Sequence, residues 1–186
     1  MNYKITADST CDLSCEQAER YSIGILPLYV QLGDRAYQDG VDIFPDDIYQ
    51  HITAGGALAT TAAVNLSDYV RAFSALSRKY DFVIHICISQ EFSCCYQNAC
   101  LAAAEYENVY VVDSRNLSTG HGLVVLEEVP HDAPAVGVVA DVLGRPAARD
   151  DEGDVLLGVD QEDGDLVRAQ RAGSGQQQCD VVAGLL

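Results

Sequence analysis

Hydroxyl-bearing side chains gather at four places in the chain where they could bind an anion. The four stretches are Asp8-Ser9-Thr10, Thr60-Thr61, the run that contains Ser89, Gln90 and Ser93, and Asp113-Ser114. Hydroxyl and backbone N–H groups satisfy a carboxylate without a buried cation, and a helix N-terminus adds a favourable dipole. The same residues also cap helices and form turns in proteins of every function. They predict an anion site only if the fold brings them together.

Residues 81–104 contain the best-defined of these stretches. An apolar run interrupted only by His85 has the length and β-branched content of a buried strand. It turns polar at Ser89 and continues with Phe92, Tyr96 and Ala99 at helical spacing. A strand, turn and helix in this order aim backbone N–H groups at a ligand above the sheet. We expect this turn to hold the anionic end of a ligand.

Alternating strands and helices over residues 80–128 predict an α/β fold with a mostly parallel sheet flanked by helices. Strands are predicted at residues 3–7, 82–88 and 109–112, and a helix with one apolar face at residues 67–79. Ligands of such sheets bind beyond the carboxyl ends of the strands. Three of the hydroxyl stretches follow predicted strands, and the Thr60-Thr61 connector could reach the same edge.

The first half of the chain predicts further elements around this sheet. A helix is expected at residues 14–21 with Asp12 or Ser14 as its N-cap, and one strand at 25–32 with Pro27 at an edge or bulge. Gly33-Asp34 then predicts a hairpin. Pro45 opens another helix, and a last one is expected to begin near residue 122.

Composition excludes several classes of function. The chain has 186 residues and a net charge of −17, with only 11 Lys and Arg. Nucleic acids and anionic membranes bind clustered basic residues, so neither is an expected partner. No run approaches the ~18 apolar residues of a membrane span, and the start MNYKITADST lacks a signal-peptide pattern. These features favour a cytoplasmic protein.

The seven cysteines give no recognisable metal or disulfide pattern. Cys11 and Cys15 are four positions apart, Cys94 and Cys95 are adjacent, and no histidine lies at zinc-ligand spacing from a pair. We therefore expect no metal and mostly structural thiols. The alternative is a redox or metal protein that uses Cys94-Cys95, whose position at a helix N-terminus would lower a thiolate pKa.

Catalysis is not expected. The chain has no G-x-S-x-G motif, and His85, His121 and the acidic residues form no sequence pattern typical of a catalytic triad. A nucleophilic serine or cysteine remains an alternative, which reaction with a fluorophosphonate or iodoacetamide probe would reveal.

Residues 129–186 differ sharply in composition from the rest. They contain no Phe, Tyr, Ile, Lys, Asn, Thr or Met, and they hold 11 acidic residues against four arginines. We expect an irregular, poorly ordered acidic tail rather than a normal second domain. An altered reading frame after Glu128 would explain the change, and a solvated acidic tail is the alternative.

Five ordered segments of residues 1–128 resemble the amino-terminal domain of the DegV family of bacterial lipid-binding proteins. They are ITADSTCDL from Ile5, ILPLYVQLGDRAYQDGVDI from Ile25, the threonine connector, ISQEFSCCYQNA from Ile88, and VVDSRNLSTGHG from Val111. The resemblance implies a two-domain α/β protein that holds a long-chain fatty acid between its domains. Some members present the acyl carboxylate to a separate fatty acid kinase, so a kinase subunit is the implied partner.

The resemblance also implies roles for individual residues. Thr60 corresponds to the threonine that hydrogen-bonds the acyl carboxylate, and Ser89 and Ser93 correspond to the serines of the family's serine–glycine turn. Cys94-Cys95 replaces the usual Gly-Thr there. Glu91 stands where Gly or Lys is common, and its charge would repel a carboxylate. The expected ligand is thus a fatty acid without other cofactors, and the alternative is a truncated remnant with a folded core and little activity.

Overall fold

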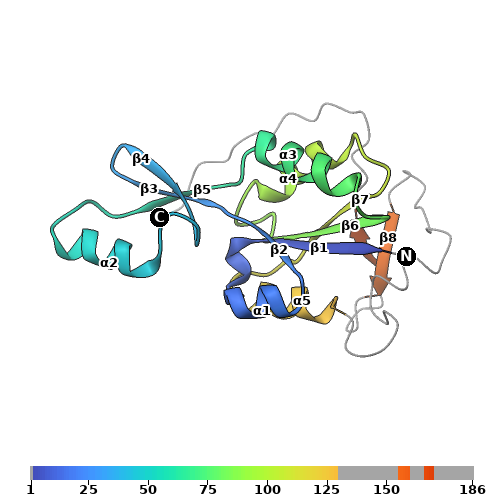
Figure 1. Ribbon diagram of the computed structural model, residues 1–186, viewed down its shortest axis with the longest axis horizontal. Coiled ribbons are helices and arrows are strands. Elements are labelled where there is room, and N and C mark those ends of the chain that lie inside the picture. Colours follow the sequence, from blue (N-terminus) through green and yellow to red (C-terminus); the bar gives the residue numbers. More distant parts are fainter. Residues whose placement is uncertain (1, 130–154, 160–165, 170–186) are drawn as a thin grey trace.

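A four-stranded parallel sheet forms the centre of the protein. The structure, a computed structural model, describes residues 2–129, 155–159 and 166–169 (Figure 1). The sheet contains β1 (Tyr3–Asp8), β2 (Gly24–Leu26), β6 (Phe82–Cys87) and β7 (Val109–Asp113). Their order is β2-β1-β6-β7, and every neighbouring pair is parallel. This confirms the predicted α/β class.

Two helices cover each face of this sheet, and we call the sheet with these helices the body (Figure 1). On one face lie α3 (Leu66–Ser77) and α4 (Cys95–Ala103), and on the other α1 (Cys15–Arg20) and α5 (Thr119–Glu127). Each face has its own apolar core. The first core includes Tyr69, Phe73, Val83, Cys87, Ala99 and Val111, and the second includes Ile5, Ala7, Ile84, Ile86 and Val125.

A smaller antiparallel unit, which we call the arm, extends from the body at the left of Figure 1. It consists of β3 (Tyr29–Leu32), β4 (Arg35–Gln38), β5 (Thr60–Ala62) and α2 (Pro45–Thr53). The strand order is β4-β3-β5. Helix α2 is amphipathic, and none of its residues is buried.

Several local signals act as the sequence predicts. Ser14 and Gln17 form a reciprocal capping box at the start of α1, because each side chain bonds the backbone N–H of the other. Asp12, the other candidate cap, instead adopts a left-handed conformation after a short 3-10 turn, η1 (Ser9–Cys11). Gly33 supplies the positive φ of the β3–β4 hairpin, and Pro45 begins α2.

The single strand expected over residues 25–32 is wrong. The chain divides there into β2, at the edge of the parallel sheet, and β3, in the arm. Pro27 has no N–H to continue a ladder, and the Leu28 N–H bonds the Ser9 hydroxyl at 3.1 Å instead of a neighbouring strand. The proline therefore marks the passage between two sheets rather than a bulge in one.

Three smaller expectations also need correction. Thr60 and Thr61 do not form an irregular connector but lie in β5, paired with β3. Phe92 precedes α4 and is 64% exposed, so it does not belong to the helix's apolar face. Helix α5 begins at Thr119, ahead of the expected start near residue 122.

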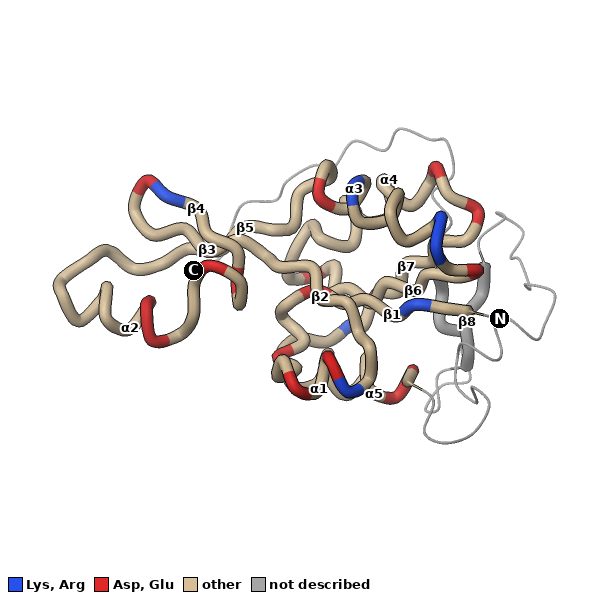
Figure 2. The backbone as a smooth tube through the Cα atoms, viewed as in Figure 1, with Lys and Arg blue, Asp and Glu red and all other residues tan. Residues whose placement is uncertain are grey.

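The expectation of an irregular acidic tail over residues 129–186 concerns residues that lie mostly outside the described part of the chain. Val129 is buried in the second core, and β8 (Val155–Val159) pairs antiparallel with β9 (Leu166–Ala169). The rest of residues 129–186 lies outside the part that the structure describes. Within the described ranges no helix is long and apolar enough to cross a membrane. Acidic residues are found at turns and helix ends of both the body and the arm (Figure 2).

Candidate functional site

The carboxyl edge of the parallel sheet brings three of the predicted stretches together. Parallel pairing sets Ala7 of β1 opposite Ile86, and Cys87 opposite Asp113 of β7. The Ser114 N–H bonds the Cys87 carbonyl at 3.1 Å, and the Gln90 N–H bonds the Asp113 carboxylate at 3.3 Å. Residues that are distant in sequence thus form one hydrogen-bonded edge, which we call the rim.

Asp8 is buried beneath this rim. Its Oδ1 accepts the Tyr69 hydroxyl at 2.6 Å and His85 Nε2 at 3.2 Å, and its Oδ2 accepts the Ile88 N–H at 3.0 Å. Burial acts to raise the pKa of Asp8, but the hydrogen bonds and charge of His85, with the Tyr69 and Ile88 donors, outweigh it and lower the pKa. Both carboxylate oxygens are therefore engaged inside the protein.

His85 extends this network into β1. Its Nδ1 lies 2.9 Å from the Thr6 hydroxyl, which also reaches the Ile84 carbonyl at 3.4 Å. The order Asp8–His85–Thr6 is that of a catalytic triad. Thr6, however, lies within a central strand and is only 1% exposed, so no substrate reaches its hydroxyl. The arrangement is a buried polar network rather than a nucleophilic site.

Three of the predicted hydroxyls hold the turns of the rim in place. Ser9 Oγ accepts the Leu28 N–H at 3.1 Å, Ser89 Oγ accepts the Glu91 N–H at 3.3 Å, and Ser114 Oγ accepts the Asn116 N–H at 3.1 Å. Ser89 and Ser114 are buried, and Ser9 is partly buried. Each hydroxyl keeps acceptor capacity, but its geometry is that of a turn-stabilising side chain.

Ser93 stands at the start of α4. Its hydroxyl accepts the Cys95 N–H at 3.2 Å and donates to Cys95 Sγ at the same distance. It is partly exposed, unlike Ser89 and Ser114. The first turn of a nine-residue helix therefore begins beside a hydroxyl that solvent can reach. That combination suits a carboxylate.

Thr60 and Thr61 lie in the arm and not on the rim itself. They are exposed neighbours on β5, opposite Gln31 and Val30 of β3, so their side chains point to opposite faces of the small sheet. The chain that follows β5 is joined to α4, because Asn98 Nδ2 donates to the Val64 carbonyl at 2.9 Å. The path from β5 thus leads directly to the helix that Ser93 precedes.

His121 is a buried residue that sequence reasoning did not place. Its Nε2 donates to the Ile86 carbonyl at 3.1 Å, and its Nδ1 lies 3.4 Å from the Thr10 hydroxyl. Burial lowers the pKa of His121, so the neutral imidazole is favoured. Next to it, a Cβ on Gly122 would lie 2.4 Å from the Cys11 carbonyl oxygen. The VVDSRNLSTGHG segment contains both residues, and its Gly could have signalled this close approach.

The alternative of a redox or metal site at Cys94-Cys95 is not supported at Cys95. Cys94 is exposed, whereas Cys95 is buried in the first core. Burial raises the pKa of the Cys95 thiol instead of lowering it. The predicted low-pKa vicinal pair is therefore wrong for Cys95, because the helix N-terminal dipole is outweighed by desolvation.

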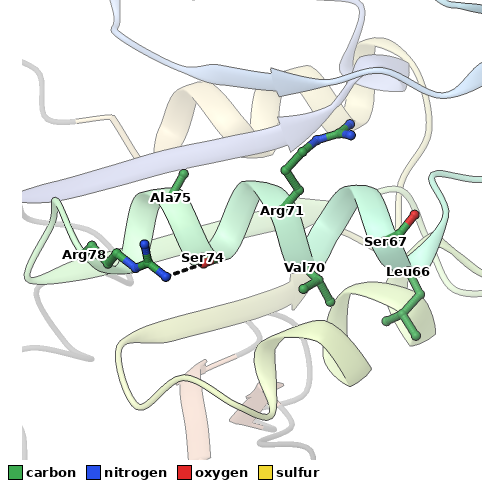
Figure 3. A pocket seen from close by; sticks show the side chains of 7 residues that line it. All are labelled: Leu66, Ser67, Val70, Arg71, Ser74, Ala75 and Arg78. Carbon is green, nitrogen blue, oxygen red and sulfur yellow. Dashed lines mark hydrogen bonds between the residues drawn. The ribbon is translucent and has the colours of Figure 1, made fainter.

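Two surface depressions lie away from the rim. One, of about 700 Å³, follows the outer face of α3, where the Arg78 guanidinium bonds the Ser74 hydroxyl at 3.2 Å (Figure 3). The other, of about 400 Å³, lies by the amino end of β1 and is lined by Tyr3, Lys4 and Tyr80 among others. Neither contains a predicted site residue.

Comparison with known proteins now assigns the chain. The model of the DegV family of uncharacterised proteins matches residues 2–129. The chain belongs to the DegV family. A DegV domain-containing protein of Clostridium perfringens is 39% identical over 126 residues, which cover 67% of this chain and 45% of the relative. The chain thus spans less than half the length of this DegV relative.

Two solved DegV-like structures share the fold. A DegV family protein from Thermus thermophilus, described by its fatty acid binding, is 35% identical with a TM-score of 0.63, over 68% of this chain and 45% of that one. A stearic acid-binding protein from Eubacterium ventriosum is 32% identical with a TM-score of 0.62, over 68% and 46%. The predicted family membership and fold class are confirmed.

Proposed function

We propose that residues 1–128 form the carboxylate-binding half of a long-chain fatty acid site and that the protein is a lipid-binding module rather than an enzyme. The carrying observation is the Ser93 hydroxyl, partly exposed at the start of α4 beside a turn anchored to β1 and β7. Two DegV-like structures more than 30% identical are described as fatty acid binders, which supports the same ligand class here. Ser93 and Thr60 would be the side-chain donors to the carboxylate.

The other predicted residues would position these donors. Asp8 has both carboxylate oxygens occupied, and its bond to the Ile88 N–H fixes the start of the turn. Ser89, Ser9 and Ser114 fix the backbone around it, while Gln90 is exposed on the same turn. A carboxylate above Ser93 would then meet an ordered set of donors, which lowers the ordering cost of binding.

The acyl chain is the part of the ligand that residues 1–128 would hold least well. A fatty acid gains ~0.8 kcal/mol for each CH₂ it buries. The relatives are about twice as long as the matched region, so the second wall of an acyl tunnel would come from their other half. We propose weak acyl binding by residues 1–128 alone. Presentation of the carboxylate to a fatty acid kinase would require the same Ser93 edge to stay accessible.

Lipid extraction and native mass spectrometry of the purified chain test the proposal. We expect a co-purified or added oleate to bind, and Ser93→Ala and Thr60→Val each to weaken binding about tenfold by removing one charge-assisted hydrogen bond. Ser77→Ala, at the far end of α3, and Thr53→Ala, on α2, are the matched controls. Thr61→Val tests whether the side chain on the opposite face of β5 also contributes to oleate binding.

Two results would overturn the proposal. The first is a folded chain that binds no acyl chain from the cell or from added oleate, which is the outcome expected of an inactive remnant. The second is an oleate affinity that is the same in the Ser93→Ala and Thr60→Val variants as in the Ser77→Ala and Thr53→Ala controls.

A further inference from the structure

Three buried side chains of different chemistry converge between β1, β6 and α3. They are Asp8, His85 and Cys87, and their ligand atoms all lie within 4.8 Å of one another. None of the three is exposed to solvent. A carboxylate oxygen, an imidazole nitrogen and a sulfur form the mixed donor set that tetrahedral zinc accepts. The vicinal pair Cys94-Cys95 is not part of this group.

The separation of the two hard donors already suits a metal ion. Tetrahedral bonds of about 2.0 Å to oxygen and nitrogen place those two atoms about 3.3 Å apart. Asp8 Oδ1 and His85 Nε2 are 3.2 Å apart in the structure. The Tyr69 hydroxyl donates to the same Asp8 oxygen at 2.6 Å and would have to move several tenths of an ångström away from it to take the fourth position.

The surrounding contacts would hold these donors in the orientation that a metal requires. His85 Nδ1 lies 2.9 Å from the Thr6 hydroxyl, which reaches the Ile84 carbonyl, so on metal binding the ring could keep a proton on Nδ1 and give up the Nε2 hydrogen bond to Asp8. Asp8 Oδ2 is fixed by the Ile88 N–H. Metal-ligating histidines and carboxylates are oriented by hydrogen bonds of this kind.

Charge balance favours a divalent cation. The Asp8 carboxylate and a Cys87 thiolate together neutralise a doubly charged ion, which removes the penalty of an uncompensated buried charge. On binding, Cys87 would release its thiol proton to solvent, and His85 would bind the ion through an unprotonated Nε2. Sulfur and imidazole ligands select zinc-class ions over magnesium or calcium.

We propose that Asp8, His85 and Cys87 form a closed structural site for a zinc-class divalent cation, taken up as the chain folds. Its donors lie between β1, β6 and α3, so an ion there would cross-link the sheet to the helix directly below the Ser89–Ser93 turn. The site is separate from the acyl ligand, which would lie on the solvent side of that turn.

Metal content of the whole chain tests this site. We expect protein produced in zinc-supplemented medium to contain about one zinc per chain by inductively coupled plasma mass spectrometry, because a closed site binds its metal on folding. Cys87→Ser should lose most of that metal. Cys95→Ser, which changes a buried cysteine of the same core outside the group, should retain it.

A second measurement covers the case in which Cys87→Ser fails to fold. Wild-type chain produced with Co²⁺ should show the visible bands of tetrahedral cobalt and a thiolate-to-cobalt charge-transfer band. A folded wild-type chain without either band, or with far less than one metal per chain, overturns the proposal and leaves a hydrogen-bonded polar core only. Equal metal content in folded Cys87→Ser and wild type overturns it as well.

Discussion

The Tyr69 hydroxyl donates a 2.6 Å hydrogen bond to the buried carboxylate of Asp8. Tyr69 lies on α3, and Asp8 is the last residue of β1. The same carboxylate also accepts the Ile88 N–H, at the start of the serine turn. One side chain therefore joins a helix, a central strand and the rim at the carboxyl edge of the sheet.

Tyr69→Phe removes one donor from that carboxylate without leaving a cavity. We expect the free energy of unfolding, measured by urea denaturation, to fall by about 1–3 kcal/mol because the buried Asp8 charge loses a hydrogen bond. Tyr49→Phe, on a residue of α2 that is 66% exposed, is the control and should have little effect. Equal stability of the two variants would contradict the role of Asp8 as a junction.

Most elements of the body could be predicted because their signals are local, whereas β2 was merged with β3 into one strand. The apolar run of β6 and the Ser14–Gln17 capping box are read within a few neighbouring residues. The network of Asp8 and His85 could not be predicted, because its partners are 77 positions apart and meet only through parallel pairing of β1 with β6. An element or contact could be predicted where its signal lies within one segment, and not where it arises only when two distant segments pack together.

The arm shows the same limit. Pro27 signalled an interruption, but only the tertiary contact between Leu28 and Ser9 directs the chain into a second sheet. The strand that contains Thr60 could not be predicted from periodicity, since a three-residue edge strand such as β5 has too few positions to reveal an alternation.

Gly122→Ala tests the contact between α5 and η1. An added Cβ would lie 2.4 Å from the Cys11 carbonyl oxygen, which is backbone and cannot rotate away. We expect about 1–3 kcal/mol of lost stability from this overpacking. Gly120→Ala is the matched control within the same helix, because its Cβ would meet the Asn116 side chain, which can move. A smaller loss for Gly122→Ala than for Gly120→Ala would contradict this packing.

Glu91→Gln tests the charge beside the proposed carboxylate site. Glu91 is exposed on the turn between Ser89 and Ser93. Removing its negative charge should tighten oleate binding about two- to fivefold, since surface charges interact by roughly 1 kcal/mol or less. Glu105→Gln, beyond the far end of α4, should leave the affinity unchanged. The increase in oleate affinity caused by Glu91→Gln should be smaller at high salt. Isothermal titration calorimetry at two ionic strengths measures this difference.

The buried imidazole of His121 predicts a loss of stability in mild acid. Burial is the largest influence on its pKa and lowers it, with the opposing pull of the Ile86 carbonyl and Asp8 being weaker. The unfolded chain therefore binds a proton on this residue at a higher pH than the folded chain does. The contribution of His121 to the free energy of unfolding is complete above the unfolded pKa of about 6.5. It decreases as the pH drops below that value, until the folded state is protonated too.

His121→Gln isolates this contribution, because glutamine keeps a donor for the Ile86 carbonyl and does not titrate. The variant should be less stable than wild type at neutral pH, and its free energy of unfolding should fall less steeply between about pH 7 and 5. Parallel urea denaturation curves across that pH range measure both slopes. If the His121→Gln slope equals that of wild type, His121 is not the titrating group.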